Sequence, residues 1–198
     1  MASPYAMQQE ELSGKVGAGM DPCAATQIKI ELADGEQKEV VFTFGSGMSP
    51  EDARNLALRF NNIEAVHYEL SRVWEYWKRT LGIVYVETPD TSLNFLVNGW
   101  LQYQIISCRL MARSGFYQSS GAFGFRDQLQ DVMALIHSKP EMTREHLLIC
   151  AGRQFKEGDV QHWWHSYSGR GIRSKCSDDY LWLPFVACLY IKAIGDTG

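Results

Sequence analysis

The chain lacks several features that would settle its class at once. It has no C-x-x-C pair, and its cysteines are odd in number. The five are Cys23, Cys108, Cys150, Cys176 and Cys188. A disulfide framework or a cysteine zinc site is therefore not expected, and reduced thiols in the cytoplasm are the default. The N-terminal stretch has Gln8 to Glu11 where a secretory signal would need apolar residues.

Charge of one sign and long apolar runs are also scarce. The net charge at pH 7 is −4 and no basic block is present, so the sequence does not favour nucleic acid or an anionic membrane as a partner. No apolar run reaches the roughly 18 residues that crossing a bilayer needs. We therefore expect a cytoplasmic location without direct membrane contact from this segment, which is compatible with inner-membrane association of a parent enzyme.

Aromatic residues, in contrast, are plentiful, with six Trp, nine Tyr and nine Phe among 198 residues. The chain is long enough for one large domain or two small ones, and its composition is that of a globular protein. Many of the rings will fill a core. Because flat rings also pack against the faces of pyranose sugars, the count is compatible with a carbohydrate ligand without indicating one.

Two strands are predicted near the N-terminus. Residues 28–32 and 40–44 alternate apolar with polar side chains, and Asp34-Gly35 lies between them. An Asp-Gly dipeptide between alternating runs is a strong signal for a hairpin turn. Two strands alone are marginal in water, so this hairpin must pack on another part of this chain or of a larger one.

The remainder of the chain is mainly helical in pattern. Ser49 and Pro50 predict the start of a helix that continues to about Leu81, with Asn61-Asn62 as the place for a break. Apolar periodicity also predicts helices at 91–108, through 132–136, at 141–155 and at 179–194, the last with a bend at Pro184. The stretch 114–131 is a candidate site loop, and 157–177 is the longest segment expected to be irregular.

Asp178 and Asp179 stand together at the start of the apolar run "YLWLPF", and two interpretations are open. An aspartate at a helix start is a favoured cap, worth roughly 1 kcal/mol, and suits the positive end of the helix. Alternatively, one of the two retains its proton for chemistry, because adjacent carboxylates repel and apolar surroundings oppose ionisation.

Four longer blocks carry a family resemblance. They are "GAGMDPCAA", "GFYQSSGAFGFRDQLQDVMAL", "REHLLICAGRQFKEGDVQHWWH" and "SGRGIRSKCSDDYLWLPF". Together, and in this order, they resemble glycoside hydrolase family 94, above all the phosphorylase domain of cyclic β-1,2-glucan synthases. Cellobiose and chitobiose phosphorylases are more distant relatives. The resemblance covers nearly the whole chain.

The resemblance implies a fold class that is mainly α with a small N-terminal antiparallel β part. Residues 1–48 would be the C-terminal end of a β-sandwich, 49–82 a helical linker, and 83–198 the first part of an (α/α)6 toroid. About four helices follow Thr91, and a closed ring needs more. The chain is therefore expected to be a fragment that works with the remainder of a parent enzyme.

The family breaks a β-glucosidic bond with inorganic phosphate and inverts the anomeric centre, giving α-glucose 1-phosphate. A β-1,2-glucan or β-glucoside oligosaccharide and phosphate are the expected partners, and no cofactor is expected. Because phosphate is already an anionic nucleophile, one carboxylate suffices where inverting glycosidases need two. That carboxylate must hold its proton near pH 7 through a raised pKa. The resemblance assigns this general acid to Asp178 and leaves Asp179 as its neighbour in the substrate site or as the helix cap.

The resemblance also assigns sugar-binding residues. Arg126 and Asp127 match the family's "FRD", which grips the hydroxyls of the glucose on the non-reducing side of the cut; an ordinary ion pair at a helix start is the alternative. The disaccharide phosphorylases have an aromatic residue and an asparagine before the aspartate pair. This sequence has Cys176 and Ser177 there, so the resemblance does not fix the sugar wall on that side.

Two further sets of residues keep two interpretations each, and a third set raises the question of a metal. Trp163 and Trp164 are candidates for a sugar platform or for loop packing. Arg170 and Arg173 would meet phosphate or a glucan chain, or belong to a solvated basic loop. The histidines of "HWWH" are three apart without a third ligand, so no metal is expected. Two other functions also compete, a non-catalytic carbohydrate-binding or scaffolding role and a glycosidase that uses water.

Overall fold

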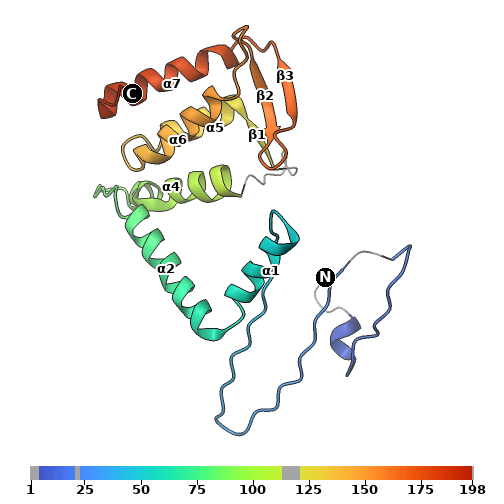
Figure 1. The fold of residues 1–198 in the computed structure, drawn as a ribbon. Helices are drawn as coiled ribbons and strands as arrows, with labels where there is room; N and C mark the ends of the chain where they lie inside the picture. Colours follow the sequence, from blue (N-terminus) through green and yellow to red (C-terminus); the bar gives the residue numbers. More distant parts are fainter. Residues whose placement is uncertain (1–4, 21–22, 113–120, 198) are drawn as a thin grey trace. The chain divides into compact units, whose positions relative to one another are not determined.

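A computed structural model describes residues 5–20, 23–112 and 121–197 of the chain, shown as a ribbon in Figure 1. The chain divides into two compact units, Met1–His67 and Tyr68–Gly198. The predicted site loop at 114–131 falls partly outside the described residues, because 113–120 are not among them. Each unit is considered by itself.

The predicted N-terminal hairpin forms its turn but not its strands. Gly35 has a φ of 76°, and the Glu36 amide donates to the Ala33 carbonyl at 3.0 Å. The described residues of 23–48 include no assigned strand, and Figure 1 draws them without arrows. The two predicted strands are therefore not formed in this structure, and the assignment of residues 1–48 to the end of a β-sandwich stays a prediction. The physical reason is exposure: the side chains of Phe42 and Phe44 are 64% and 102% exposed, and two strands with an uncovered apolar face are marginal.

The two helices that follow confirm the sequence signals. Helix α1 (Pro50–Arg59) begins at Ser49, whose Oγ accepts a hydrogen bond from the Asp52 amide at 3.1 Å. The predicted break follows directly. Helix α2 (Ile63–Leu81) then begins, and the Asn62 Oδ1 accepts from the Ala65 amide at 2.8 Å.

The helical series predicted at 91–108 is present and kinked. It consists of α3 (Thr91–Phe95), the π-helical η2 (Leu96–Trp100), α4 (Leu101–Gln104) and the π-helical η3 (Ile105–Met111). The kink lies at Asn98 and Gly99, where Gly99 has a φ of 109°. The Asn98 side chain pairs with both backbone groups of Val86, at 2.7 and 2.8 Å, in the way that a neighbouring strand would. This pairing draws the backbone away from helical geometry.

Three further helices complete the second unit. They are α5 (Phe125–Met133), α6 (Pro140–Ala151) and α7 (Asp179–Ile194). Helix α7 has the predicted bounds, and α6 ends before the predicted Phe155. The mainly helical class is thus confirmed, whereas the (α/α)6 toroid stays a prediction.

The antiparallel sheet lies in the second unit and includes a segment expected to be irregular. Its strands β1 (Ala122–Gly124), β2 (Val160–His165) and β3 (Gly171–Ser174) pair antiparallel in the order β1-β2-β3. The sequence of β2 does not alternate between apolar and polar residues, because Trp163 and Trp164 put apolar rings on both faces of the strand. One β2 residue is extra in the ladder: Gln161 and Trp163 oppose neighbouring residues of β3, which makes a β-bulge at position 162.

The core of the second unit joins the sheet to the helices. Its buried members are Ile106, Leu110, Phe125, Leu129, Val132, Leu135, Leu147, Cys150, Val160, Trp164, Val186 and Tyr190. Helices α5 and α7 pack on each other and on β2, and Figure 1 shows the sheet at one end of these helices. Strand β1 runs directly into α5, and α7 begins shortly after β3. The chain segments that precede α5 and α7 therefore meet at the sheet.

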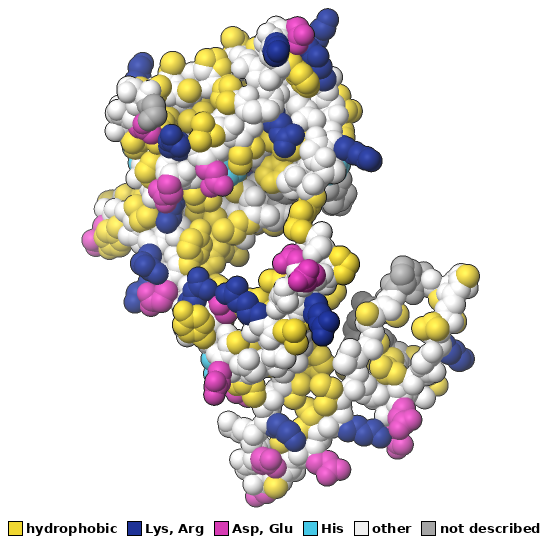
Figure 2. All heavy atoms as spheres, viewed as in Figure 1, with side chains coloured by type: hydrophobic (Ala, Val, Ile, Leu, Met, Phe, Trp, Pro, Cys, Tyr) yellow, Lys and Arg dark blue, Asp and Glu magenta, His cyan; other side chains and the backbone are white. Residues whose placement is uncertain are grey.

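The surface is mixed in character. Acidic and basic side chains are interspersed on the face shown in Figure 2, with apolar side chains between them. None of the helices that the structure describes combines the length and the apolar content that a membrane span requires.

Candidate active site

The pairing of β1–α5 with β3–α7 joins two residues that stand 52 positions apart. The Arg126 Nη1 donates to the Asp178 Oδ2 at 2.8 Å. Arg126 lies in the first turn of α5 and Asp178 directly before α7. Their side chains are 49% and 43% exposed, so the pair is open to solvent and to a ligand. The structure thus brings the predicted acid and a predicted sugar-binding residue together.

A second donor holds the other oxygen of the same carboxylate. The Cys176 Sγ donates to the Asp178 Oδ1 at 3.0 Å. These hydrogen bonds from the Cys176 thiol and the Arg126 guanidinium lower the pKa of Asp178 to about 2, and the bond to Asp178 raises the pKa of Cys176. Asp178 is therefore ionised near neutral pH in this structure, which is the opposite of the raised pKa expected for a general acid.

The helix-cap interpretation does not describe Asp178. It occupies the position before α7, but its backbone is already helical and its side chain makes no capping hydrogen bond. The carboxylate is directed instead at Arg126 and Cys176. The repulsion expected between adjacent carboxylates is relieved because the two aspartates have different partners.

Asp179 is buried, with 1% of the residue exposed, and its partner is a histidine of the sheet. The Asp179 Oδ2 and the His162 Nδ1 are 2.6 Å apart, and the His162 side chain is 46% exposed. Asp179 is thus neither a solvated cap nor a free neighbour of the acid. Sequence reasoning missed this pair, because 17 residues and a strand separate its members and histidine spacing in "HWWH" carries no signal for it.

Asp127 lies close to the start of its own helix. A Cβ at Gly124 would collide with the Asp127 carboxylate, so the absence of a side chain at 124 leaves the space that this carboxylate occupies. A negative charge in the first turn of a helix is favourable. Asp127 and Arg126 therefore place opposite charges in the first turn of α5.

The two tryptophans of β2 have different environments. Trp164 is 2% exposed and lies in the core, stacked on Phe123 at 6.1 Å, with the Arg153 guanidinium 5.0 Å from its ring. The packing interpretation accounts for Trp164. Trp163 is half-buried, with its ring edge-on to His165 at 5.5 Å, and its role as a sugar platform stays a prediction.

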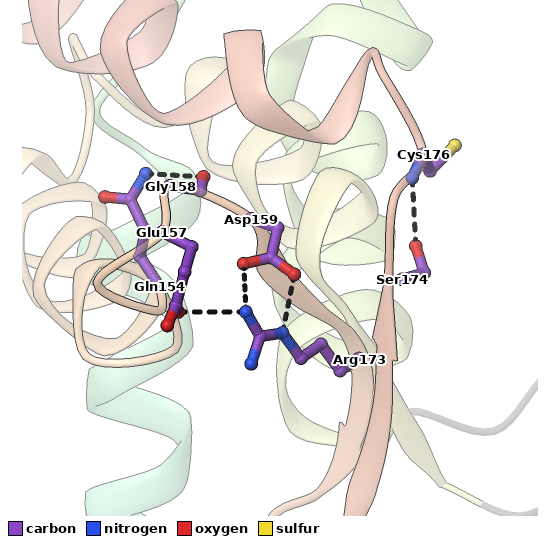
Figure 3. A network of polar contacts seen from close by, with 7 residues as sticks. All are labelled: Gln154, Glu157, Gly158, Asp159, Arg173, Ser174 and Cys176. Atoms are coloured by element: carbon purple, nitrogen blue, oxygen red, sulfur yellow. Dashed lines mark hydrogen bonds and ion pairs between the residues drawn. The ribbon is translucent and has the colours of Figure 1, made fainter.

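Arg173 is engaged in an ion-pair network, drawn in Figure 3. It donates to Asp159 at 2.5 and 2.6 Å and to Glu157 at 2.9 Å, and its guanidinium lies 4.1 Å from the Phe155 ring. The hydrogen bond from Arg173 lowers the pKa of Asp159. These contacts tie β3 to the loop before β2 and do not include Asp178. The side chain of Arg170 is exposed in the turn before β3.

Two hollows of the second unit are lined by residues other than the Arg126–Asp178 pair. One, of about 570 Å³, is lined mainly by apolar and aromatic residues around Leu81, Phe95, Trp100 and Tyr103. Another, of about 410 Å³, is lined by Arg173 and Lys175 together with Glu157 and Asp159. We therefore define the candidate site by its side-chain chemistry, around the half-exposed Arg126–Asp178 pair.

One group of possible metal donors occurs among the described residues. The ligand atoms of His162, Cys176 and Asp179 lie within 4.8 Å of one another. Nitrogen, sulfur and oxygen are donors that zinc accepts. The contact between His162 and Asp179 already employs two of them, and the thiol donates to Asp178, so hydrogen bonding accounts for the whole group.

Comparison with known proteins supplies the family. Residues 76–198 match the model of the glycosyl hydrolase 94 superfamily catalytic domain, and residues 1–63 match that of the glycosyl hydrolase 94 supersandwich domain. The chain therefore belongs to the glycosyl hydrolase 94 family.

Individual relatives are enzymes that make or break glycosides. The chain is 42% identical over 188 residues to the cyclic beta-(1,2)-glucan synthase NdvB of Rhizobium meliloti. This match covers 94% of the chain and 6% of the synthase. It is 24% identical over 224 residues to the N,N'-diacetylchitobiose phosphorylase of Vibrio proteolyticus, over 99% of the chain and 28% of the relative. It is 28% identical over 198 residues to the cellobionic acid phosphorylase of Neurospora crassa, over 98% of the chain and 24% of the relative. The chain thus spans less than a third of the length of each.

Proposed function

We propose that this chain carries the acid and part of the glucose-binding site of an inverting glycoside phosphorylase that acts on β-1,2-glucan. The observation that carries the proposal is the Arg126–Asp178 pair, in which two residues of separate sequence motifs meet after the two outer strands of the sheet. Family membership supplies the reaction class. The higher identity to a β-1,2-glucan synthase than to the two disaccharide phosphorylases supports the choice of glucan.

The reaction we propose needs one proton and one nucleophile. A phosphate oxygen attacks the anomeric carbon as the glycosidic C–O bond breaks, and Asp178 gives its proton to the departing oxygen. The products are α-glucose 1-phosphate and a shortened glucan, and Asp178 is left as a carboxylate. This carboxylate is the form that Arg126 and Cys176 stabilise in the structure.

The resting state must therefore change before catalysis. We propose that bound glucose draws the Arg126 guanidinium from Asp178 to its own hydroxyls and excludes water from the site. Loss of a positive partner and loss of hydration both raise the pKa of a carboxyl group, so Asp178 gains its proton in the complex. Inorganic phosphate is the co-substrate, no cofactor takes part, and the rest of an (α/α)6 toroid closes the site.

Phosphorolysis tests this function directly. The full-length gene product that carries this sequence is incubated with β-1,2-glucooligosaccharides, with and without inorganic phosphate. We expect glucose 1-phosphate only when phosphate is present. Glucose released without phosphate would instead establish a glycosidase, and cello-oligosaccharides serve as the control for linkage.

A second candidate is a non-catalytic carbohydrate-binding or scaffolding role. The low pKa of Asp178 favours it, because an aspartate that stays ionised near pH 7 can bind hydroxyls but cannot donate a proton. Saccharide binding in the absence of any turnover by the full-length product would favour this candidate over the phosphorylase.

A further inference from the structure

We propose that His162 is a further residue of this site, and that its Nε2 binds a hydroxyl of the sugar that departs from Asp178. This inference deepens the proposed function and rests on it for the identity of the sugar. Three independent observations carry it: a bulge in the sheet, a buried carboxylate and a shared thiol.

The first observation is that His162 is the bulged residue of β2. Gln161 pairs with Arg173 and Trp163 pairs with Ile172, so His162 is the additional residue of β2. An extra residue interrupts the ladder and redirects a side chain, and bulges are over-represented beside active sites. On its other edge β2 pairs Trp163 with Gly124, directly before the helix that carries Arg126. The bulge therefore lies where the site is built.

The buried carboxylate fixes the orientation of the ring. Asp179 is 1% exposed and its Oδ2 is 2.6 Å from the His162 Nδ1. An ionised carboxylate only accepts hydrogen bonds, so with Asp179 ionised the Nδ1 is the donor and Nε2 is the ring nitrogen outside this pair. In the part of the chain that the structure describes, no second partner is recorded for His162, whose side chain is 46% exposed. The pair with Asp179 thus orients the ring through Nδ1, and Nε2 can bind a ligand.

The thiol places the His162 ring on the leaving-group side. The Cys176 Sγ is 3.0 Å from the Asp178 Oδ1 and belongs to the same 4.8 Å group as the His162 ring. The acid and the ring thus flank one thiol. In an inverting displacement the acid stands at the departing oxygen, and the nucleophile approaches from the opposite face of the sugar. A group beside the acid therefore lies on the side of the departing oxygen and not of the phosphate. Arg126, at the Asp178 Oδ2, is assigned to the transferred glucose, and we assign His162, beside the thiol that binds Oδ1, to the departing sugar.

Two substitutions separate a binding role from a structural one. In His162→Asn the side-chain amide can occupy the place of Nδ1 and keep the bond to Asp179, but nothing replaces Nε2. In His162→Gln the longer amide reaches the place of Nε2 and gives up the bond to Asp179. His146→Asn is the matched control, because the His146 Nδ1 also has an oxygen partner, the Met142 carbonyl at 2.9 Å, and His146 lies in α6.

The experiment measures the dissociation constant for β-1,2-glucooligosaccharides, the KM values for acceptor glucan and phosphate, and thermal melting, all in the full-length product. We expect His162→Asn to melt like the wild type, and its oligosaccharide dissociation constant and acceptor KM to rise about tenfold, the effect of one lost hydrogen bond. Its KM for phosphate should be unchanged. His162→Gln should melt earlier and retain more affinity than His162→Asn, and His146→Asn should bind as the wild type does.

Three results would overturn the inference. Wild-type affinity in His162→Asn would reduce His162 to a structural partner of Asp179. A raised KM for phosphate alone would place the ring on the nucleophile side, and weaker wild-type binding after EDTA treatment would indicate a metal. If the wild type shows no turnover, the proposed function fails, and the binding measurements still decide whether His162 contacts the saccharide.

Discussion

At the scale of single residues, the central feature of the site is the Asp178 carboxylate, which accepts hydrogen bonds from two donors. Arg126 and Cys176 each bind one oxygen of Asp178, so the structure presents the acid in the charge state that follows proton transfer. The identity of the acid can therefore be tested through the leaving group, because only a poor leaving group needs the proton.

We expect Asp178→Asn in the full-length product to lower the rate on the natural glucan by about 10²–10⁴-fold, the usual contribution of general acid catalysis. The melting temperature should move little, because the ion pair that is lost is half exposed. A glucosyl donor with a good leaving group should recover much of the rate. Asp179→Asn is the control and should affect every donor alike; leaving-group dependence in that variant, or normal turnover by Asp178→Asn, would refute the assignment.

A glycine gives a separate test of Asp127. The φ of Gly124 is −85°, which alanine adopts without strain, so the obstacle to Gly124→Ala is the Asp127 carboxylate itself. We expect this variant to displace the carboxylate and weaken saccharide binding about ten- to a hundredfold, as Asp127→Asn should, since bonds to charged groups contribute roughly 1.5–3 kcal/mol. Titration calorimetry measures the affinity. Gly152→Ala, with ordinary space at Cβ, should bind normally; unchanged affinity in Gly124→Ala would remove Asp127 from the site.

At the scale of elements, the ion-pair network of Arg173 joins β3 to the loop before β2. Arg173 lowers the pKa of Asp159, so the folded protein binds the Asp159 proton less readily than the unfolded chain. The resulting stabilisation is complete above the unfolded pKa, near 4, and is lost as the pH falls through the lowered pKa of the folded state.

Chemical denaturation as a function of pH measures this effect. We expect the wild type to exceed Asp159→Asn in free energy of unfolding by a constant amount between about pH 6 and 8, and this difference to shrink below about pH 4. Asp178 also titrates at low pH, but it is present in both proteins and cancels. Glu157→Gln should change little, because Glu157 is 69% exposed. A difference that grew on acidification would show that the pair does not stabilise the fold.

Elements also show what the sequence could and could not predict. Caps and apolar periodicity located α1, α2 and α7, because those signals act within one helix. The β2–β3 hairpin was missed, because Trp163 and Trp164 make both faces of β2 apolar and hide its alternation. The N-terminal strands were predicted from alternation and from the Asp34-Gly35 turn. Strand pairing also requires that the apolar face be covered, and Phe42 and Phe44 are largely exposed. In the site, motif resemblance indicated Arg126 and Asp178, whereas the partners of Asp179 and Cys176 depend on tertiary contacts.

At the scale of the whole molecule, helix α7 is apolar on nearly every side. Leu181 is 68% and Phe185 50% exposed, while Val186 and Tyr190 are buried. A helix that is hydrophobic all round is normally covered on all sides, and exposed apolar patches favour association.

We therefore expect the 198-residue chain, expressed by itself, to associate as its concentration rises and to bind a hydrophobic dye. Light scattering coupled to size-exclusion chromatography measures the association. Replacing Leu181 and Phe185 together by lysine should reduce both association and dye binding, whereas the same change at the polar, exposed Gln130 should not. A monodisperse monomer that melts cooperatively and turns over glucan fully would contradict this expectation.

The bulge in β2 has a consequence for how this family varies by insertion and deletion. Without position 162, Gln161 and Trp163 would be consecutive and would oppose Arg173 and Ile172, which are consecutive in β3. The hairpin would then be a regular ladder. Deleting residue 162 would therefore cost the sheet no strand pairing. Asp179, however, would be a buried carboxylate without its partner. We expect homologues that lack the residue at 162 to have replaced the aspartate at 179 as well. The histidine and the aspartate should therefore occur together or be absent together.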